Sequence, residues 1–87
     1  MYYTYVLKSK KDSELYIGST NDLRRRLSEH NTGKVTSTKS RVPFELVYYE
    51  AYRAENDARM RESRLKSRGQ ARIQLLRRMK DSLQGES

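Results

Sequence analysis

The chain is organised around residues 16–31, which read YIGSTNDLRRRLSEHN. The first of these residues favour a β-strand, and Gly18 allows the backbone to turn sharply or to approach a ligand closely. Asn21 is a suitable N-cap for the helix that follows, and Asp22 places a carboxylate in the first turn, where the helix dipole favours negative charge. Residues 16–31 therefore predict a strand, a sharp turn and a helix in immediate succession.

The predicted helix places two chemically useful groups on one face. Its apolar stripe is narrow and consists of Leu23 and Leu27. Arg26 and His30 are four residues apart, so their side chains point in the same direction. A tyrosine at the end of the strand, Tyr16, is thus followed closely by a guanidinium and an imidazole. These groups are suited to gripping and cleaving a phosphodiester.

The whole chain is short and strongly basic. Its 87 residues predict a single domain, residues 1–87, and a hydrophobic content of 34% predicts a thin core to which seven tyrosines contribute. The formal net charge of +8 indicates a polyanionic partner, and nucleic acid is the first expectation. We see no long basic amphipathic helix at either end, which argues against a membrane surface as the partner.

The residue types that are missing exclude several kinds of site. The sequence has no cysteine, which excludes disulfides, a thiol nucleophile and a cysteine-ligated metal. His30 is the single histidine, so a histidine-rich zinc site is not expected. We see no signal peptide and no transmembrane run, and we therefore expect a cytoplasmic, nucleoid-associated protein.

Residue preferences predict an α+β arrangement along the rest of the chain. Tyrosine and β-branched residues predict three strands, over residues 1–8, 14–18 and 44–52. The first two strands form a hairpin around a polar turn, and the third can lie beside them. Helices are expected over residues 22–30, 55–66 and about 70–82, the last of them basic, followed by a fraying end.

The motifs within residues 1–66 resemble those of the GIY-YIG nucleases. Tyr3-Thr4-Tyr5 stands where the family has Gly-Ile-Tyr, and Tyr16-Ile17-Gly18 is its Tyr-Ile-Gly element. Tyr5 and Tyr16 are eleven residues apart, and Arg26 lies ten residues beyond Tyr16, both spacings being similar to the family's. The helix motif, Pro43 and Glu62 resemble the small stand-alone bacterial branch of the family.

The resemblance implies a small three-stranded antiparallel sheet flanked by helices. It also implies hydrolysis of a phosphodiester with one divalent metal ion, Mg²⁺ or Mn²⁺. Transferred residue by residue, the implied site consists of the motif tyrosines Tyr5 and Tyr16, the catalytic Arg26, its helical neighbour His30, and the metal ligand Glu62. Two positions depart from the family pattern, because Tyr3 replaces the first glycine and no asparagine follows Glu62.

These residue types suit such a reaction. Magnesium usually takes only one or two protein carboxylates and keeps several waters, so Glu62 alone is sufficient. Arg26 offers a planar cation for bidentate contact with a phosphate. The general base stays open here: the resemblance favours Tyr5, while Tyr16 and His30 are alternatives. A phenol with a pKa near 10 needs nearby positive charge to act as a base at neutral pH.

Glu62 also has an ordinary alternative. It can form a helix salt bridge with Arg59 or with Lys66, which is four residues away. Its position on the apolar stripe, between Ala58 and Leu65, argues against that pairing. Other acids that can hold a metal ion are Glu50, Glu55 and Asp57.

Two basic segments predict contact with phosphates. One is a loop rich in hydroxyls and cations, and the other begins in the second helix and continues into the third. The expected nucleic-acid-binding residues are Lys34, Thr38, Lys39, Arg41, Arg64, Lys66, Arg68 and Arg72. Neither segment has a pattern for reading bases, so we expect little sequence specificity and a steep loss of binding with salt.

The first functional prediction is a metal-dependent endonuclease that acts on single-stranded, branched or damaged DNA, with RNA left open as a substrate. The alternative is a binding module of the same fold with weak or lost catalysis. A third possibility is a subunit of a DNA repair complex, or a homodimer, that docks through the C-terminal helix. Leu75, Leu76 and Met79 are the residues expected to form such a docking patch.

Overall fold

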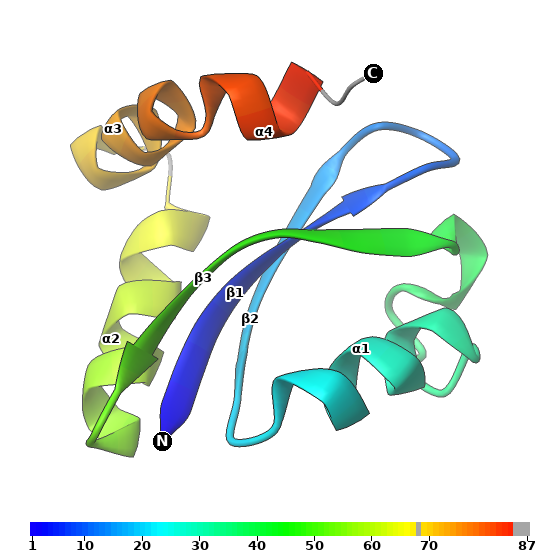
Figure 1. Ribbon diagram of the computed structural model, residues 1–87, viewed down its shortest axis with the longest axis horizontal. Helices are drawn as coiled ribbons and strands as arrows, with labels where there is room; N and C mark the ends of the chain where they lie inside the picture. The colour runs from blue at the N-terminus through cyan, green and yellow to red at the C-terminus, as the bar shows by residue number, and fades with distance from the viewer. Residues whose placement is uncertain (68, 85–87) are drawn as a thin grey trace.

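The computed structural model describes residues 1–67 and 69–84. One antiparallel sheet is built from β1 (Tyr2–Ser9), β2 (Leu15–Thr20) and β3 (Phe44–Tyr52), in the order β2-β1-β3 (Figure 1). The central strand β1 pairs with both β2 and β3, so β2 and β3 are the edge strands. The α+β fold with a three-stranded antiparallel sheet is thereby confirmed.

Helices cover both faces of this sheet. Helix α1 (Leu23–Asn31) lies on one side, and α2 (Glu55–Lys66), α3 (Gln70–Arg78) and α4 (Lys80–Gln84) lie on the other (Figure 1). A short 3₁₀ turn, Lys39–Arg41, leads into β3. Among the described residues, no helix is long and apolar enough to cross a membrane.

Alternation along β1 divides the core into two halves. Val6 packs with Ile17, Leu65 and Leu75 on the face covered by α2, α3 and α4. Tyr5 and Leu7 point to the opposite face and pack with Phe44, Leu23 and Leu27 beneath α1. Successive residues of a strand point to opposite faces, so one strand supplies both half-cores. The register of β1 and β3 shifts between Val6 and Leu7, which marks a β-bulge or irregularity in this pairing.

Two side chains, those of Thr4 and Asn31, fix by hydrogen bonds the helices that flank the functional region. The Thr4 hydroxyl donates to the carbonyl oxygen of Ala58 at 2.7 Å, which ties α2 to the central strand. The Asn31 side chain accepts from the Phe44 amide at 2.6 Å and donates to the Phe44 carbonyl at 3.0 Å. The end of α1 is thus held at the start of β3.

The helix ends differ from two expectations. Asp22, and not Asn21, is the N-cap of α1, because the Asp22 carboxylate accepts a hydrogen bond from the Arg25 amide at 3.0 Å. The helix ends as expected, with Gly33 at φ +75°. The basic segment predicted as one helix over 70–82 is instead two helices, α3 and α4, separated at Met79.

The prediction that Leu75, Leu76 and Met79 form an exposed apolar docking patch was also wrong for two of these residues. Leu75 and Met79 are both 2% exposed and belong to the core under β1 and β2. Helix α4 is held to the sheet at Leu83, whose carbonyl accepts a hydrogen bond from Lys8 Nζ at 2.6 Å. Ile73 is the exposed apolar residue of this region.

Candidate active site

The site begins where Tyr5 on β1 pairs with Gly18 on β2. The phenol ring of Tyr5 lies over Gly18, in the space that a side chain would otherwise fill. The Tyr16 side chain lies on the same side of the sheet as Tyr5. The two rings form a tilted aromatic pair with centroids 6.4 Å apart. Gly18 is required here for close approach, which brings both phenols to the edge strand.

His30 lies beneath the two phenols at the end of α1. Its Nε2 is 2.9 Å from the Tyr5 hydroxyl, and its Nδ1 is 2.9 Å from the Thr38 hydroxyl. The imidazole ring meets Tyr16 edge-on at a centroid distance of 5.0 Å. His30 and Thr38 have no exposed surface, so this chain of hydrogen bonds is closed to solvent.

Burial controls the protonation of both partners. It raises the pKa of the Tyr5 phenol to about 12, and the positive charge of Arg26 beside it opposes the rise. Burial also lowers the pKa of His30 to about 4, and the charge of Arg26 adds to that effect. At neutral pH both groups are therefore uncharged, and His30 carries one ring proton.

Arg26 projects from the second turn of α1 toward this cluster. Its guanidinium forms an ion pair with Glu29, at 3.0 Å between Nη1 and Oε1. Its side chain is about one-third exposed, so one side of the guanidinium remains open to a ligand. Tyr5 and Glu29 raise the pKa of Arg26, which stays charged at any working pH.

Glu62 approaches the same strand from α2. Its Oε1 accepts a hydrogen bond from the Ser19 hydroxyl at 2.6 Å, directly beside Gly18. Its Oε2 forms an ion pair with Lys66 Nζ at 2.6 Å, and the Lys66 ammonium lies 6.0 Å from the centre of the Tyr16 ring. The expectation that its position on the apolar stripe would prevent a pair with Lys66 was wrong. Glu62 is partly exposed, so the flexible Lys66 side chain can reach it from the next turn of α2.

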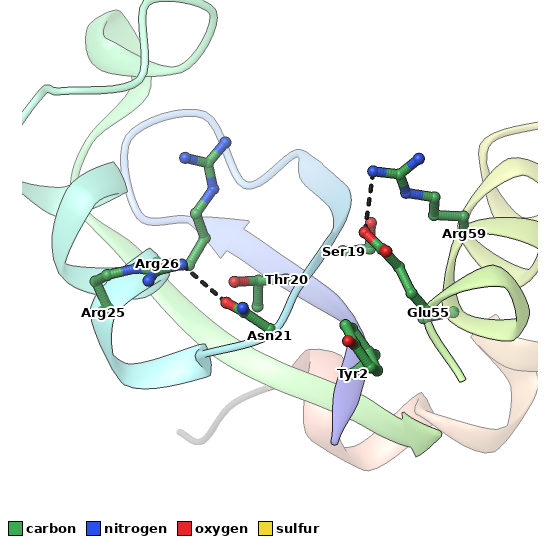
Figure 2. Close-up of a pocket in the computed structure, with 9 residues that line it drawn as sticks. Tyr2, Ser19, Thr20, Asn21, Arg25, Arg26, Glu55 and Arg59 are labelled. Carbon is green, nitrogen blue, oxygen red and sulfur yellow. Dashed lines mark hydrogen bonds and ion pairs between the residues drawn. The ribbon is translucent and has the colours of Figure 1, made fainter. Parts of the chain in front are cut away.

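A hollow of about 300 Å³ opens between α1 and α2 (Figure 2). Arg25 and Arg26 lie on the α1 side, Arg59 lies on the α2 side, and Ser19 is part of the lining between them. A second, more open depression shares Ser19 and Arg59 with the first and is lined also by Glu62. We call the two depressions together the groove. Its guanidinium groups are those of Arg25, Arg26 and Arg59, and its carboxylates are Glu62 and Glu55, the latter paired with Arg59.

The groove includes residues that sequence reasoning set aside. The sequence assigned no role in the site to Arg25, and Arg59 appeared only as an alternative salt-bridge partner of Glu62. Both lie at helix beginnings that converge on the groove, with Arg25 bonded to Asn21 at 3.0 Å and Arg59 paired with Glu55 at 3.0 Å (Figure 2). For Arg59, the sequence spacing could have indicated this place. Arg59 precedes Glu62 by three residues, so the two side chains share one face of the helix.

The donor set at Glu62 fits one divalent ion such as Mg²⁺. Its carboxylate is 20% exposed at the open groove, and Lys66, which holds one oxygen, is 51% exposed and easily displaced. Among residues 1–67 and 69–84, no group of three or more His, Cys, Asp or Glu side chains forms a ready-made cage. That pattern suits magnesium, which binds through one carboxylate together with waters and substrate phosphates.

The residues expected to bind nucleic acid divide into two groups. Lys34, Lys39 and Arg64 are exposed, and their predicted contact with phosphates stays a prediction. Thr38 does not fit that role, because it is fully buried and bonded to His30. Lys66 is exposed but is engaged with Glu62.

Two of the expected arginines are used inside the fold. Arg41 pairs with Asp12 at 2.9 Å and lies 5.4 Å from the centre of the Phe44 ring. Arg72 donates to the carbonyl oxygen of Leu65 at 3.1 Å and so satisfies the end of α2. The prediction for Arg68 falls outside the described residues.

Comparison with known proteins gives the family of the chain. The sequence matches the family described as the GIY-YIG catalytic domain over residues 1–80, and the chain belongs to the GIY-YIG family. A UPF0213 protein of Bacillus pumilus is 45% identical over 67 residues, which cover 76% of this chain and 67% of that protein. A UPF0213 protein of Streptococcus agalactiae is 38% identical over 81 residues, which cover 91% of each chain.

A solved structure supports the fold independently. The solution NMR structure of a UPF0213 protein from Bacillus halodurans matches with a TM-score of 0.54 and 33% identity, covering 92% of this chain and 86% of that one. A GIY-YIG catalytic domain indicates a nuclease with a nucleic-acid substrate. The predicted relationship to this family and to its small stand-alone members is confirmed.

Proposed function

We propose that the protein is a divalent-metal-dependent endonuclease that hydrolyses phosphodiester bonds in DNA, with selectivity for structure or single strands. The observation that supports this most directly is the convergence on one strand edge. Tyr5, Tyr16 and His30 gather around Gly18, while Glu62 reaches the adjacent Ser19 from α2. These groups come from four different elements, β1, β2, α1 and α2, and they meet at the end of one strand.

The proposed division of labour follows from charge. Arg26, with one open side, binds the non-bridging oxygens of the scissile phosphate. Glu62 holds a metal ion, which when bound neutralises the charge that builds up on the phosphate. Arg25 and Arg59 hold the neighbouring stretch of backbone in the groove. Selectivity then comes from the shape of the strand, since no base-reading element lies beside the groove.

Tyr5 is the proposed general base, and His30 accepts its proton. The Tyr5 O–H bond breaks, and the proton moves to His30 Nε2 over the 2.9 Å hydrogen bond. The resulting phenolate takes a proton from the attacking water, whose oxygen bonds to phosphorus as the P–O bond to the leaving group breaks. The leaving oxygen takes a proton from solvent in the open groove, and His30 then releases its extra proton, which restores the neutral imidazole. Because the pKa of Tyr5 is about 12 and that of His30 is about 4, the transfer is strongly uphill in the free protein. Arg26 favours the phenolate, and a bound cation would favour it further.

A cleavage panel tests this proposal. Single-stranded, duplex, flap and junction DNA, with matching RNA, are incubated with Mg²⁺, Mn²⁺ or chelator. We expect cleavage of at least one DNA substrate with metal and none with chelator. Glu62→Gln and Arg26→Gln should each lower the rate by about 100-fold or more, whereas Arg24→Gln, on the solvent side of α1, should not. Tyr5→Phe and Tyr16→Phe distinguish the two phenols as base.

One observation favours the second candidate, a binding module. Glu62 is already satisfied by Ser19 and Lys66, as a purely structural carboxylate would be. A binding module predicts tight, salt-sensitive DNA binding with no cleavage of any substrate in either metal. It also predicts that Glu62→Gln leaves binding unchanged or tighter, since a carboxylate repels phosphate.

A further inference from the structure

Thr38 reaches the site through His30 although it lies in the loop between α1 and β3. Its hydroxyl oxygen is 2.9 Å from His30 Nδ1 and 3.4 Å from the carbonyl oxygen of Val35. Thr38, like His30, is fully buried. In the hydrogen bond between the buried Thr38 hydroxyl and the buried His30 imidazole, one group donates the hydrogen and the other accepts it.

Two arrangements of protons are conceivable around a neutral His30. In the first, Nδ1–H donates to Thr38, the Thr38 hydroxyl donates to Val35, and Nε2 is free to accept from Tyr5. In the second, the Thr38 hydroxyl donates to Nδ1, and Nε2–H donates to the Tyr5 oxygen. The heavy-atom positions are compatible with both, so the surrounding acceptors decide between them.

The acceptors favour the first arrangement. The Tyr5 hydroxyl is buried between His30 and Arg26, and a guanidinium only donates hydrogen bonds. If Nε2 carried the proton, the Tyr5 hydroxyl would lose its acceptor, and a buried donor without a partner is costly. In the first arrangement Tyr5, His30 and Thr38 each have a partner for the hydrogen they donate.

We propose that Thr38 is a positioning residue that holds the His30 proton on Nδ1, so that Nε2 is the acceptor for the Tyr5 proton. This proposal rests on the proposed nuclease function for its catalytic consequence. When the Tyr5 O–H bond breaks and the Nε2–H bond forms, the imidazolium still donates Nδ1–H to Thr38. The hydrogen bonds from His30 to Thr38 and from Thr38 to Val35 therefore keep their direction during the transfer.

The single histidine makes a direct measurement possible. Nitrogen-15 NMR of the folded protein at pH 7, without metal or DNA, gives one pair of imidazole nitrogens, and the protonated and unprotonated nitrogens have well-separated shifts. We expect the wild-type protein and Thr38→Ser to show the proton on Nδ1. Thr38→Val, which has nearly the same shape but no oxygen, should shift the population toward the Nε2–H form. A wild-type protein with the proton on Nε2, or a Thr38→Val protein unchanged from it, would overturn the proposal.

Cleavage rates supply the second readout. Thr38→Val should lower kcat by about tenfold or more with unchanged affinity for DNA, and Thr38→Ser should restore it. Loss of DNA affinity with unchanged kcat would instead make Thr38 a surface contact and contradict the proposal. Lys39→Gln, the exposed neighbour, provides the contrast, since it should weaken DNA binding and leave the His30 proton where it is.

The two readouts separate the two proposals. If the wild-type protein cuts nothing but its His30 proton responds to Thr38→Val, the nuclease function fails and the positioning by Thr38 stands. If the wild-type protein cuts and the His30 proton does not respond, the positioning fails and the nuclease function stands. Because Thr38→Ser keeps the hydroxyl, unfolding of the Val variant would not prevent the comparison with wild type.

Discussion

The hydroxyl of Tyr5 occupies the place that a side chain at Gly18 would need. A Cβ built on Gly18 would lie 2.5 Å from the Tyr5 hydroxyl oxygen, 2.6 Å from Tyr5 Cζ and 3.2 Å from Tyr16 Cε2. Cβ atoms in real structures essentially never make contacts shorter than 3.0 Å, so the first two distances are not tolerated. The Tyr5 ring is packed in the core and can make room only by leaving its place beside His30. The absence of a side chain at Gly18 is therefore what allows two phenols to meet His30 at the strand edge.

This contact predicts the effect of Gly18→Ala. The added methyl group overpacks a buried position, and we expect a loss of about 1–3 kcal/mol of unfolding free energy, measured by urea denaturation. The Tyr5 ring should move away from His30 at the same time. In a Tyr5→Leu background the same substitution should cost much less, because the ring that blocks the methyl group is gone. Equal costs in both backgrounds would contradict the steric explanation.

Burial of His30 predicts a pH-dependent stability. The pKa of His30 falls from 6.5 to about 4 on folding, so between these values the unfolded chain binds a proton that the folded chain does not. The contribution is complete above pH 6.5 and is lost as the pH falls toward 4, to a limit of about 3 kcal/mol. Denaturant unfolding from pH 4 to 7 should show a steeper decline for wild type than for His30→Gln. Parallel curves would mean that the pKa of His30 is not lowered by folding.

A partly buried charge network around Glu50, away from the site, predicts a purely structural effect. Glu50 accepts two hydrogen bonds from Arg61, at 2.9 and 3.0 Å, and further hydrogen bonds from the hydroxyls of Tyr48 and Tyr52. Burial alone would raise the pKa of Glu50, but these donors outweigh it and hold the pKa below its usual value.

Glu50→Gln should therefore cost about 2 kcal/mol of stability, because it leaves the half-buried Arg61 without its charge partner. The matched control is Glu55→Gln, which breaks the exposed pair with Arg59 and should cost less than about 0.5 kcal/mol. Thermal unfolding of both variants checks this. Equal losses of stability in the two variants would show that partial burial does not make the Glu50 ion pair more stabilising than an exposed pair.

The arginines of the groove predict a salt signature. Arg25→Gln and Arg59→Gln should each weaken binding of single-stranded DNA and lower the slope of log K against log salt by about 1, as expected for one lost phosphate contact. Arg24→Gln, one residue away and pointing to solvent, should leave the slope unchanged. Fluorescence anisotropy in chelator, from 50 to about 200 mM salt, measures binding without cleavage. A slope that changes equally in all three variants would place the DNA elsewhere.

Much of this protein is determined locally by its sequence. Tyrosine-rich and β-branched segments specify the strands, with β3 matching its predicted range of 44–52 and α2 its range of 55–66. Alternation within β1 already assigns Tyr5 and Val6 to opposite faces, as the two half-cores confirm. The motif spacings identify the family, because a hairpin and the following helix place Tyr5, Tyr16 and Arg26 through short-range geometry.

Other features depend on partners that are distant in sequence, and only the tertiary structure decided them. Thr38 reads as a surface hydroxyl until the loop folds over His30, and Glu62 reads as unpaired until Ser19, 43 residues earlier, meets it at the sheet edge. Met79 reads as part of a docking patch until it is seen in the core. The periodicity of a sequence indicates which face of its own helix or strand a residue occupies. It carries no information about which other element packs against that face. Because hydrogen bonding and burial depend on that neighbouring element, only the tertiary structure shows them.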